Sequence, residues 1–580
     1  MAKKKEATKP IGENDIRNAA ATLQKYIQGK QNLDERIINN EDWWKLQHWK
    51  DYKKNKKERL EQSTSAWMFN SIINKHADAM DNFPEPTVLP REENDEDIAK
   101  TLSEVIPVIL SNCKFKNTYS KNWTKKLKYG TAIYAVLWNS ELNRGMGDID
   151  VKAIDLLSFY WEPGVTDLQS SRNIFLLALE DNDLLIEQYP ELDGKLSGDA
   201  IDKKEYHYDD TVDTTNKSIV VDWYYKKRTD RGVVVHYVKY VGGTLLFASE
   251  NDPQYENGWY TDGKYPFVID VMYTEEGTPA GFGLVDVCRS PQEYIDRLDI
   301  AILLNSEEAA RRRYLVKDSA SINEEEFNDI EKRLIHCAGS PNEDNFRALD
   351  VPNLSGTYLA VLQNKVAELK ETSANRDFNQ GGTTSGVVAA SAITALQESG
   401  NKTSRDLISE SYAVYEEMCN MIIERIRQFY DYPRVFRIIG EKGQREYVSL
   451  DNIQLQGREI EIAGEVFEKA APIFDVEPKA QKANPYSKYA QNELALQFYQ
   501  LGFFNPQMAD QALQCIDMMD FEGKEQIKER IQQGAEQEAK YMQMQQIAVM
   551  AAQALAENGD NRVLQALTGG LNDSNEAKQM

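Results

Sequence analysis

The order of apolar and polar residues divides the chain into a mixed first half and a mainly helical second half. Apolar residues at helical spacing predict helices over about residues 14–60, 66–82 and 95–129. Six β-rich runs follow, each bounded by Gly, Asn, Asp or Pro: Thr131–Asn139, Ile149–Trp161, Asn173–Leu179, Ser218–Lys227, Val233–Phe247 and Pro266–Tyr273. The pair Gly242-Gly243 predicts a hairpin turn within the fifth run. We therefore expect the first half to combine α and β structure.

A long helix with apolar residues on two faces opens the second half. It is predicted over residues 283–312, interrupted only by Pro291. One stripe at helical spacing contains Leu284, Val287, Leu298 and Ile302. Ile300, Leu303 and Leu304 place a second apolar patch on another face. A helix with two apolar faces must be packed from two sides, either by neighbouring copies of the chain or by a large core of its own.

The segments after this helix alternate between helix, loop and short strands. Residues 313–353 form a small insert of mixed pattern that includes the acidic run Glu324, Glu325 and Glu326. Helix is expected again over 356–376, followed by a Gly/Thr-rich loop at 377–387. A longer helix over 388–430 contains Gly400, where we expect a kink. Short strands near 434–439, 446–449 and 458–468 and an all-helical tail complete the pattern.

The charge balance limits the kinds of partner that the surface can bind. The chain has 93 acidic and 68 basic residues and a formal charge of −25, which argues against a surface that grips nucleic acid throughout. Two basic stretches with interleaved aromatic residues, 43–59 and 123–128, could bind a nucleic-acid strand or could be helices with buried Trp faces. The run Arg311–Arg313 either complements the dipole of the long helix or contacts nucleic acid.

No enzymatic motif survives inspection. No Gly-Lys pair is followed by Ser or Thr, so the phosphate-binding loop of a packaging motor is absent. The five cysteines form no CxxC pair, and no HExxH motif occurs, so we expect no metal site, no cofactor and no disulfide framework. The basic N-terminus leads into no apolar signal region, and no run of 18 apolar residues occurs, so we expect neither secretion nor a membrane span.

The order of these segments resembles the portal proteins of tailed bacteriophages. The resemblance covers about residues 15–560, and its most specific parts are Gly281–Asp299, Asn379–Glu398 and Pro485–Ile527, the last including Gly502-Phe-Phe-Asn-Pro506. It implies an α+β portal fold with a mixed α/β wing, a long-helix stem, a small α/β clip and a helical crown. Its parts would be the N-terminal wing (1–282), first stem helix (283–312), clip (313–353), second stem helix (354–376), tunnel loop (377–387), long kinked wing helix (388–431), C-terminal wing strands (432–479) and crown (480–580).

The resemblance implies a structural protein, not an enzyme. Copies of the chain, usually twelve, would form a ring around a channel for packaging and ejection of double-stranded DNA. The ring would dock the terminase large subunit and later a head–tail adaptor, and would meet the major capsid and scaffolding proteins. It would be assembled in the host cytoplasm and kept in the virion at the portal vertex.

The resemblance also assigns residues to these roles. The tunnel loop would present Arg376, Asn379, Gln380, Thr383, Thr384 and Ser385 to DNA. The stem interface between subunits would contain Leu284, Val287, Leu298 and Ile302, and the clip would offer Glu324, Glu325 and Glu326 to partners. Three alternatives remain: the loop is a flexible glycine linker, the glutamates are a solvated face, or the chain is another adaptor or scaffold protein that does not line the channel.

Overall fold

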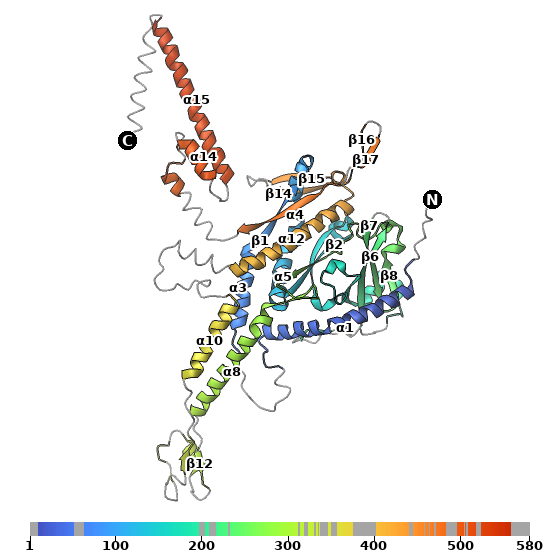
Figure 1. Cartoon of the computed structure of the whole chain (residues 1–580), viewed down its shortest axis with the longest axis vertical. Helices are drawn as coiled ribbons and strands as arrows, with labels where there is room; N and C mark the ends of the chain where they lie inside the picture. The colour runs from blue at the N-terminus through green and yellow to red at the C-terminus, as the bar shows by residue number, and fades with distance from the viewer. Residues whose placement is uncertain are drawn as a thin grey trace. The chain divides into compact units, whose positions relative to one another are not determined.

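In the computed structural model, the chain divides into two compact units, residues 1–481 and 482–580 (Figure 1). The described residues are 10–50, 63–196, 204–207, 216–229, 232–310, 314–317, 323–329, 332–334, 336, 346–349, 356–374, 402–439, 445–457, 459–462, 465–468, 471–482, 496–503, 505, 508–517 and 524–557. Among the helices and strands they form, no helix combines the length and apolar character needed to cross a membrane.

Four long helices open the first unit: α1 (Glu13–Trp44), α3 (Trp67–Asp81), α4 (Glu96–Asn112) and α5 (Phe115–Tyr129). The prediction of one helix over 95–129 is wrong, because Lys114 takes a left-handed conformation (φ 54°) and separates α4 from α5. The first predicted helix likewise ends early, since α1 stops at Trp44 and Leu46 has a φ of 58°. Residues 51–62 lie outside the described part.

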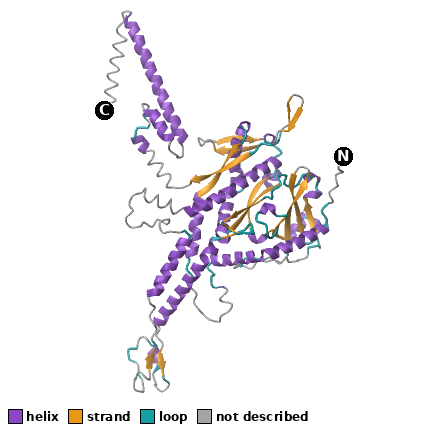
Figure 2. Cartoon of the chain, viewed as in Figure 1, coloured by secondary structure: helices purple, strands orange, loops and turns teal. Residues whose placement is uncertain are grey.

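Two antiparallel sheets follow (Figure 2). A three-stranded sheet has the order β3 (Asp148–Ile154), β2 (Thr131–Asn139), β9 (Phe267–Val271). A five-stranded meander contains β4 (Phe159–Trp161), β5 (Asn173–Asp181), β6 (Lys217–Thr229), β7 (Gly232–Val241) and β8 (Thr244–Ala248). The six predicted β runs and the hairpin turn are confirmed, except that the run 149–161 is two strands separated by a short 3-10 helix.

Shorter elements complete this half. They are α6 (Leu142–Gly145), α7 (Asn182–Gln188), β10 (Tyr273–Thr274) and β11 (Gly281–Phe282), with β10 paired to β11. A strand that the sequence did not predict, β1 (Asn82–Pro90), pairs with β18 (Phe474–Lys482) from the far end of the unit. The prolines of β1 suit a sheet of only two strands, where each strand is an edge.

The second half of the first unit contains the predicted long helices. They are α8 (Leu284–Ala310), α10 (Gly356–Thr372) and α12 (Lys402–Phe429). Between α8 and α10, β12 (Tyr314–Val316) pairs with β13 (Phe346–Ala348), and α9 (Glu324–Asn328) lies between them in sequence. After α12 come two hairpins, β14 (Arg434–Ile439) with β15 (Arg445–Leu450) and β16 (Glu459–Ile462) with β17 (Glu465–Glu468).

The largest core of this unit joins residues that are far apart in sequence. It combines α3, α4, α5, the start of α8 and much of α12, with Trp123, Leu284, Cys419 and Ile422 among its buried side chains. A second core fills the space between the two sheets, and a third packs α1 on one face of the meander. The helices after residue 283 are therefore built into the N-terminal half by shared hydrophobic cores.

The second unit is helical in its described part. Helix α14 (Ala509–Asp517) packs on the first half of α15 (Lys524–Glu557) around Phe498, Ile516 and Ile531. The second half of α15 is solvent-exposed in the chain and carries large apolar side chains: Tyr541, Met542, Met544, Ile547 and Met550.

Candidate functional site

Helices α8 and α10 pack against one another as a helical hairpin (Figure 1). The Lys365 ammonium of α10 lies 5.3 Å from the centre of the Tyr294 ring of α8, which places the two helices in side-chain contact. The first half of α8 belongs to the core, with Val285, Cys288 and Ile295 fully buried. The second half, from Arg297 onward, has no buried residue.

The outer part of this hairpin exposes large apolar side chains on both helices. Between 38% and 55% of the surface of each is exposed: Tyr294, Leu303, Leu304, Tyr358, Leu359 and Val361. Scattered apolar residues on a surface are common, but six on one two-helix element form an exposed apolar face, and such faces are typical of interaction surfaces.

The predicted interface residues lie at different depths. Leu284 is only 2% exposed and packs inside the chain's own core, so no part of it is left for a neighbouring copy. Val287, Leu298 and Ile302 are half-buried. The predicted stripe therefore begins in the core of the chain and passes outward along α8.

Three glycines allow close backbone packing at the start of α8. A Cβ atom on Gly130, which has a φ of 80°, would lie 2.1 Å from the backbone carbonyl carbon of Phe282. A Cβ on Gly283 would lie 2.7 Å from the Gly130 amide nitrogen, and one on Gly281 would lie 2.0 Å from the Tyr273 oxygen. The Gly281-Phe-Gly283 motif therefore allows close packing of Gly281 against β10 and of Gly283 against the end of α5.

A buried polar cluster holds the middle of α8 to the end of α1 and the start of α3. His48 Nδ1 lies 2.6 Å from Oδ2 of Asp296, and both side chains are almost fully buried. Oδ1 of Asp296 accepts hydrogen bonds from the backbone N–H and hydroxyl of Ser65, each at 2.9 Å, and from Gln292 Nε2 at 3.0 Å. Sequence reasoning missed this cluster, because one aspartate among many in an acidic chain gives no distinguishing signal.

The acidic run of the small insert begins α9. Asn323 caps this helix by accepting from the backbone N–H groups of Glu325 and Glu326. Glu326 also accepts from the backbone and the ring of His336, and these hydrogen bonds lower the pKa of the Glu326 carboxyl. Glu324 and Glu325 are exposed.

The loop predicted to face a channel lies outside the described residues. This applies to Arg376, Asn379, Gln380, Thr383, Thr384 and Ser385, to Gly400 and to Arg311–Arg313. The helices on either side of the loop are described: α10 ends next to Ser373, whose hydroxyl contacts that of Ser71 at 3.1 Å, and α12 begins at Lys402.

The basic stretch at 123–128 is structural. Trp123 is buried in the main core, and Lys126 pairs with Asp270 at 2.7 Å without solvent exposure. Lys125 and Lys128 are also engaged, with the Ile154 carbonyl and with Glu41. Of the stretch 43–59, Trp43 is buried against His48, and residues 51–62 lie outside the described part.

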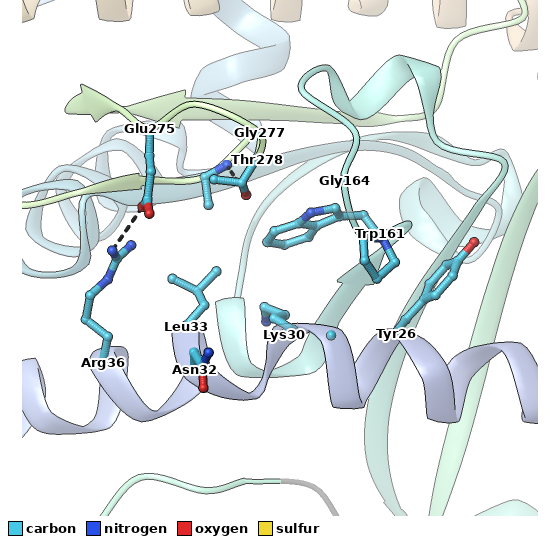
Figure 3. Close-up of a pocket in the computed structure, with 13 residues that line it drawn as sticks. Tyr26, Lys30, Asn32, Leu33, Arg36, Trp161, Gly164, Glu275, Gly277 and Thr278 are labelled. Atoms are coloured by element: carbon cyan, nitrogen blue, oxygen red, sulfur yellow. Dashed lines mark hydrogen bonds and ion pairs between the residues drawn. The ribbon is translucent and has the colours of Figure 1, made fainter.

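A cavity of about 410 Å³ lies between α1, the loop after β4 and the turn between β10 and β11 (Figure 3). Its lining includes Lys30, Arg36, Trp161 and Glu275. Arg36 pairs with Glu275 at 3.0 Å, and Lys30 pairs with Asp34 at 3.0 Å and lies over the Trp161 ring. Within the described ranges, no cluster of three or more His, Cys, Asp or Glu side chains could hold a metal ion.

Comparison with known proteins assigns the chain to a family. No curated protein sequence matches it significantly. The family described as phage P22-like portal protein matches residues 18–266 and 234–569, which together span nearly the whole chain. This match includes the α8–α10 hairpin, the segment between its helices, and α12. The chain therefore belongs to the phage P22-like portal protein family.

Proposed function

We propose that copies of this chain assemble into a closed ring whose central channel passes double-stranded DNA during packaging and ejection. Membership of the portal family supports a structural, non-enzymatic role. The observation that carries the proposal is the exposed apolar surface on both helices of the α8–α10 hairpin. A head-to-tail ring gives each copy two neighbours, so both sides of such a hairpin become covered.

The parts of the ring follow from the order of the elements. The hairpin forms the stem, and the insert of residues 313–353 forms the clip, which docks the terminase large subunit and later a head–tail adaptor. Residues 377–387 form the tunnel loop, residues 1–282 with 388–479 form the wing, and 480–580 form the crown. The ring meets the capsid and scaffolding proteins at the portal vertex of the virion.

The net charge supports passage of DNA without strong binding. Each chain has a formal charge of −25, so a ring of many copies is strongly acidic as a whole. Every strong phosphate contact would slow a sliding duplex. The polar residues assigned to the tunnel loop, Asn379, Gln380, Thr383, Thr384 and Ser385, are short and uncharged, and suit transient contacts. Arg376, at the start of the loop, is the cation placed to touch phosphate.

The native mass of the purified chain tests ring formation. We expect a mass of about twelve subunits and a particle with a central hole in negative-stain images. Replacing Leu303 and Leu359 by Asp should abolish the ring, because each carboxylate would be buried without a partner between stems. Leu184→Asp is the matched control, since Leu184 is 57% exposed on α7 and should tolerate the charge. A compact dimer, or a ring unaffected by the stem substitutions, would contradict the proposal.

Deletion of Asn379–Thr384 tests the assignment of the loop. We expect rings of normal mass that package or retain less DNA, because the loop faces the channel rather than a neighbouring subunit. Loss of the ring on this deletion would show that the loop belongs to the subunit interface.

A further inference from the structure

Two buried serines on α12 each connect a lysine and an aspartate from the N-terminal half of the chain. Ser404 Oγ accepts from Lys75 Nζ at 2.7 Å and donates to Asp78 Oδ2 at 2.9 Å. Ser411 Oγ accepts from Lys126 Nζ at 2.6 Å and donates to Asp270 Oδ2 at 2.8 Å. The same three-part arrangement therefore occurs twice on one helix.

The two arrangements lie on one face of α12, two turns apart. Seven residues of α-helix span about 10.5 Å and return to the same side of the helix. Leu407 and Ile408 lie between the serines and are buried, and Tyr415, Met418 and Ile422 continue the same apolar face. The serines are thus small polar interruptions of a stripe that otherwise packs in the main core.

The partners of Ser404 come from one helix, and those of Ser411 come from a helix and a strand. Lys75 and Asp78 belong to α3, Lys126 to α5 and Asp270 to β9. Lys126 and Asp270 also form a direct ion pair at 2.7 Å, and both side chains are almost fully buried. Burial lowers the pKa of Lys75 and raises that of Asp78, because the surroundings disfavour charge. The hydrogen bonds that Ser404 and Ser411 make are therefore important to both sets of buried lysine and aspartate side chains.

An apolar stripe alone specifies the position of a helix along its axis weakly. Packed helices can move by one turn, about 5.4 Å, and find new apolar contacts. Such a shift of α12 would bring Leu407 or Ile408 opposite a lysine–aspartate pair, which would then lose its hydroxyl partner. Only the observed position satisfies both pairs, and buried polar contacts of this kind can select one register.

We propose that Ser404 and Ser411 are positioning residues that fix the axial register of α12, and so fix where the preceding tunnel loop enters the channel. The first statement stands on the contacts of α12 alone. The second rests on the proposed function, because it takes residues 377–387 to be the loop that contacts DNA. Ser404 lies close to the start of α12 at Lys402 and follows residue 387, the last residue of that loop, by 17 residues in sequence.

Hydrogen–deuterium exchange of the intact ring tests whether Ser404 and Ser411 fix the register of α12. In Ser404→Ala/Ser411→Ala, we expect amide exchange in residues 402–415 to be at least tenfold faster than in the wild type, while peptides from β5–β7 are unchanged. Ser409→Ala is the matched control, since it makes the same chemical change on the exposed side of the same helix. Ser404→Thr should exchange like the wild type, because it keeps the hydroxyl. Equal exchange rates in the double variant and in Ser409→Ala would show that the two serines do not fix the register of α12.

DNA retention by procapsids that contain the variant ring tests the coupling to the loop. We expect rings of normal mass that retain at least tenfold less DNA in the double variant, with retention restored in Ser404→Thr/Ser411→Ala relative to the double variant. Faster exchange with normal retention would overturn the coupling. If rings with the Asn379–Thr384 deletion also retain DNA normally, the proposed function of the loop is wrong. The hydrogen-exchange result then decides by itself whether the two serines fix the register of α12.

Discussion

Replacing Asp296 by Ala should loosen the attachment of α8 to the segments that follow α1 and precede α3. This carboxylate accepts from Ser65 twice, from Gln292 and from His48, all at 2.6–3.0 Å, and it is fully buried. Its removal leaves four donors without this acceptor, including the almost fully buried imidazole of His48. Breaking a buried charged cluster by deleting one partner typically costs about 3–5 kcal/mol.

The assay must report on local opening, because a chain of this size with two units does not unfold in one step. Native-state hydrogen exchange of residues 284–300 meets this need. A local loss of about 3–5 kcal/mol corresponds to exchange faster by roughly 100-fold to 4,000-fold, at about 1.4 kcal/mol per factor of ten. Asp296→Asn should have a smaller effect, because its amide oxygen can still accept from Ser65.

Asp299→Asn provides the control on the same helix. Burial and the nearby Asp296 raise the pKa of the Asp299 carboxyl, so its charge is unfavourable where it lies. Its neutralisation should leave exchange in α8 unchanged or make it slower. If Asp296→Ala exchanges no faster than Asp299→Asn, the polar cluster does not anchor α8, and apolar packing of its first half is sufficient.

Three further predictions concern other parts of the chain. Burial raises the pKa of both Cys288 and Cys419 to about 12, so at pH 8 only about one thiol in 10⁴ is ionised. Iodoacetamide reacts with the thiolate, so mass spectrometry should find both cysteines unmodified in the native chain and modified only after denaturation. The hydrogen bonds with His336 lower the pKa of Glu326 in the folded chain, so its contribution to stability is present above the usual pKa near 4.5 and is lost as pH falls through the lowered pKa. The difference in Tm between wild type and Glu326→Gln should therefore shrink over that pH range, and a constant difference would contradict this account. Gly130→Ala should displace the start of α8, because the added Cβ would meet the Phe282 backbone. We expect misassembled or absent rings when the native mass is measured, whereas normal rings would show that the backbone there can adjust.

Sequence periodicity predicted most helices and strands, because their apolar positions are continuous over one or more turns or pleats. The strand at 131–139 and the helix that begins near 284 lie where the patterns place them. The break at Lys114 was missed because a left-handed lysine carries no sequence signal comparable to glycine. The β1–β18 pair was missed because its strands are far apart and β1 is rich in proline, which signalled the end of a helix.

The candidate site was less accessible from sequence, because its important contacts join distant segments. Periodicity cannot tell which acidic residue will be buried, so Asp296 and Asp270 looked like ordinary surface charges. A usable signal existed for Ser404 and Ser411, which interrupt an apolar stripe at a spacing of seven. The assignment of Leu284 to a subunit interface combined periodicity with the family resemblance, and periodicity identifies an apolar face but not the chain that covers it.

The pairing of β1 with β18 also bears on the synthesis of the protein. About 380 residues separate the two strands in sequence. At translation rates of about 5–20 residues per second, β1 leaves the ribosome roughly 20–80 s before its partner has been made. During that interval its backbone N–H and C=O groups form an open edge on which other nascent chains can pair. The prolines of β1 remove amide donors from this edge, and so protect the unfinished chain against aggregation until β18 arrives.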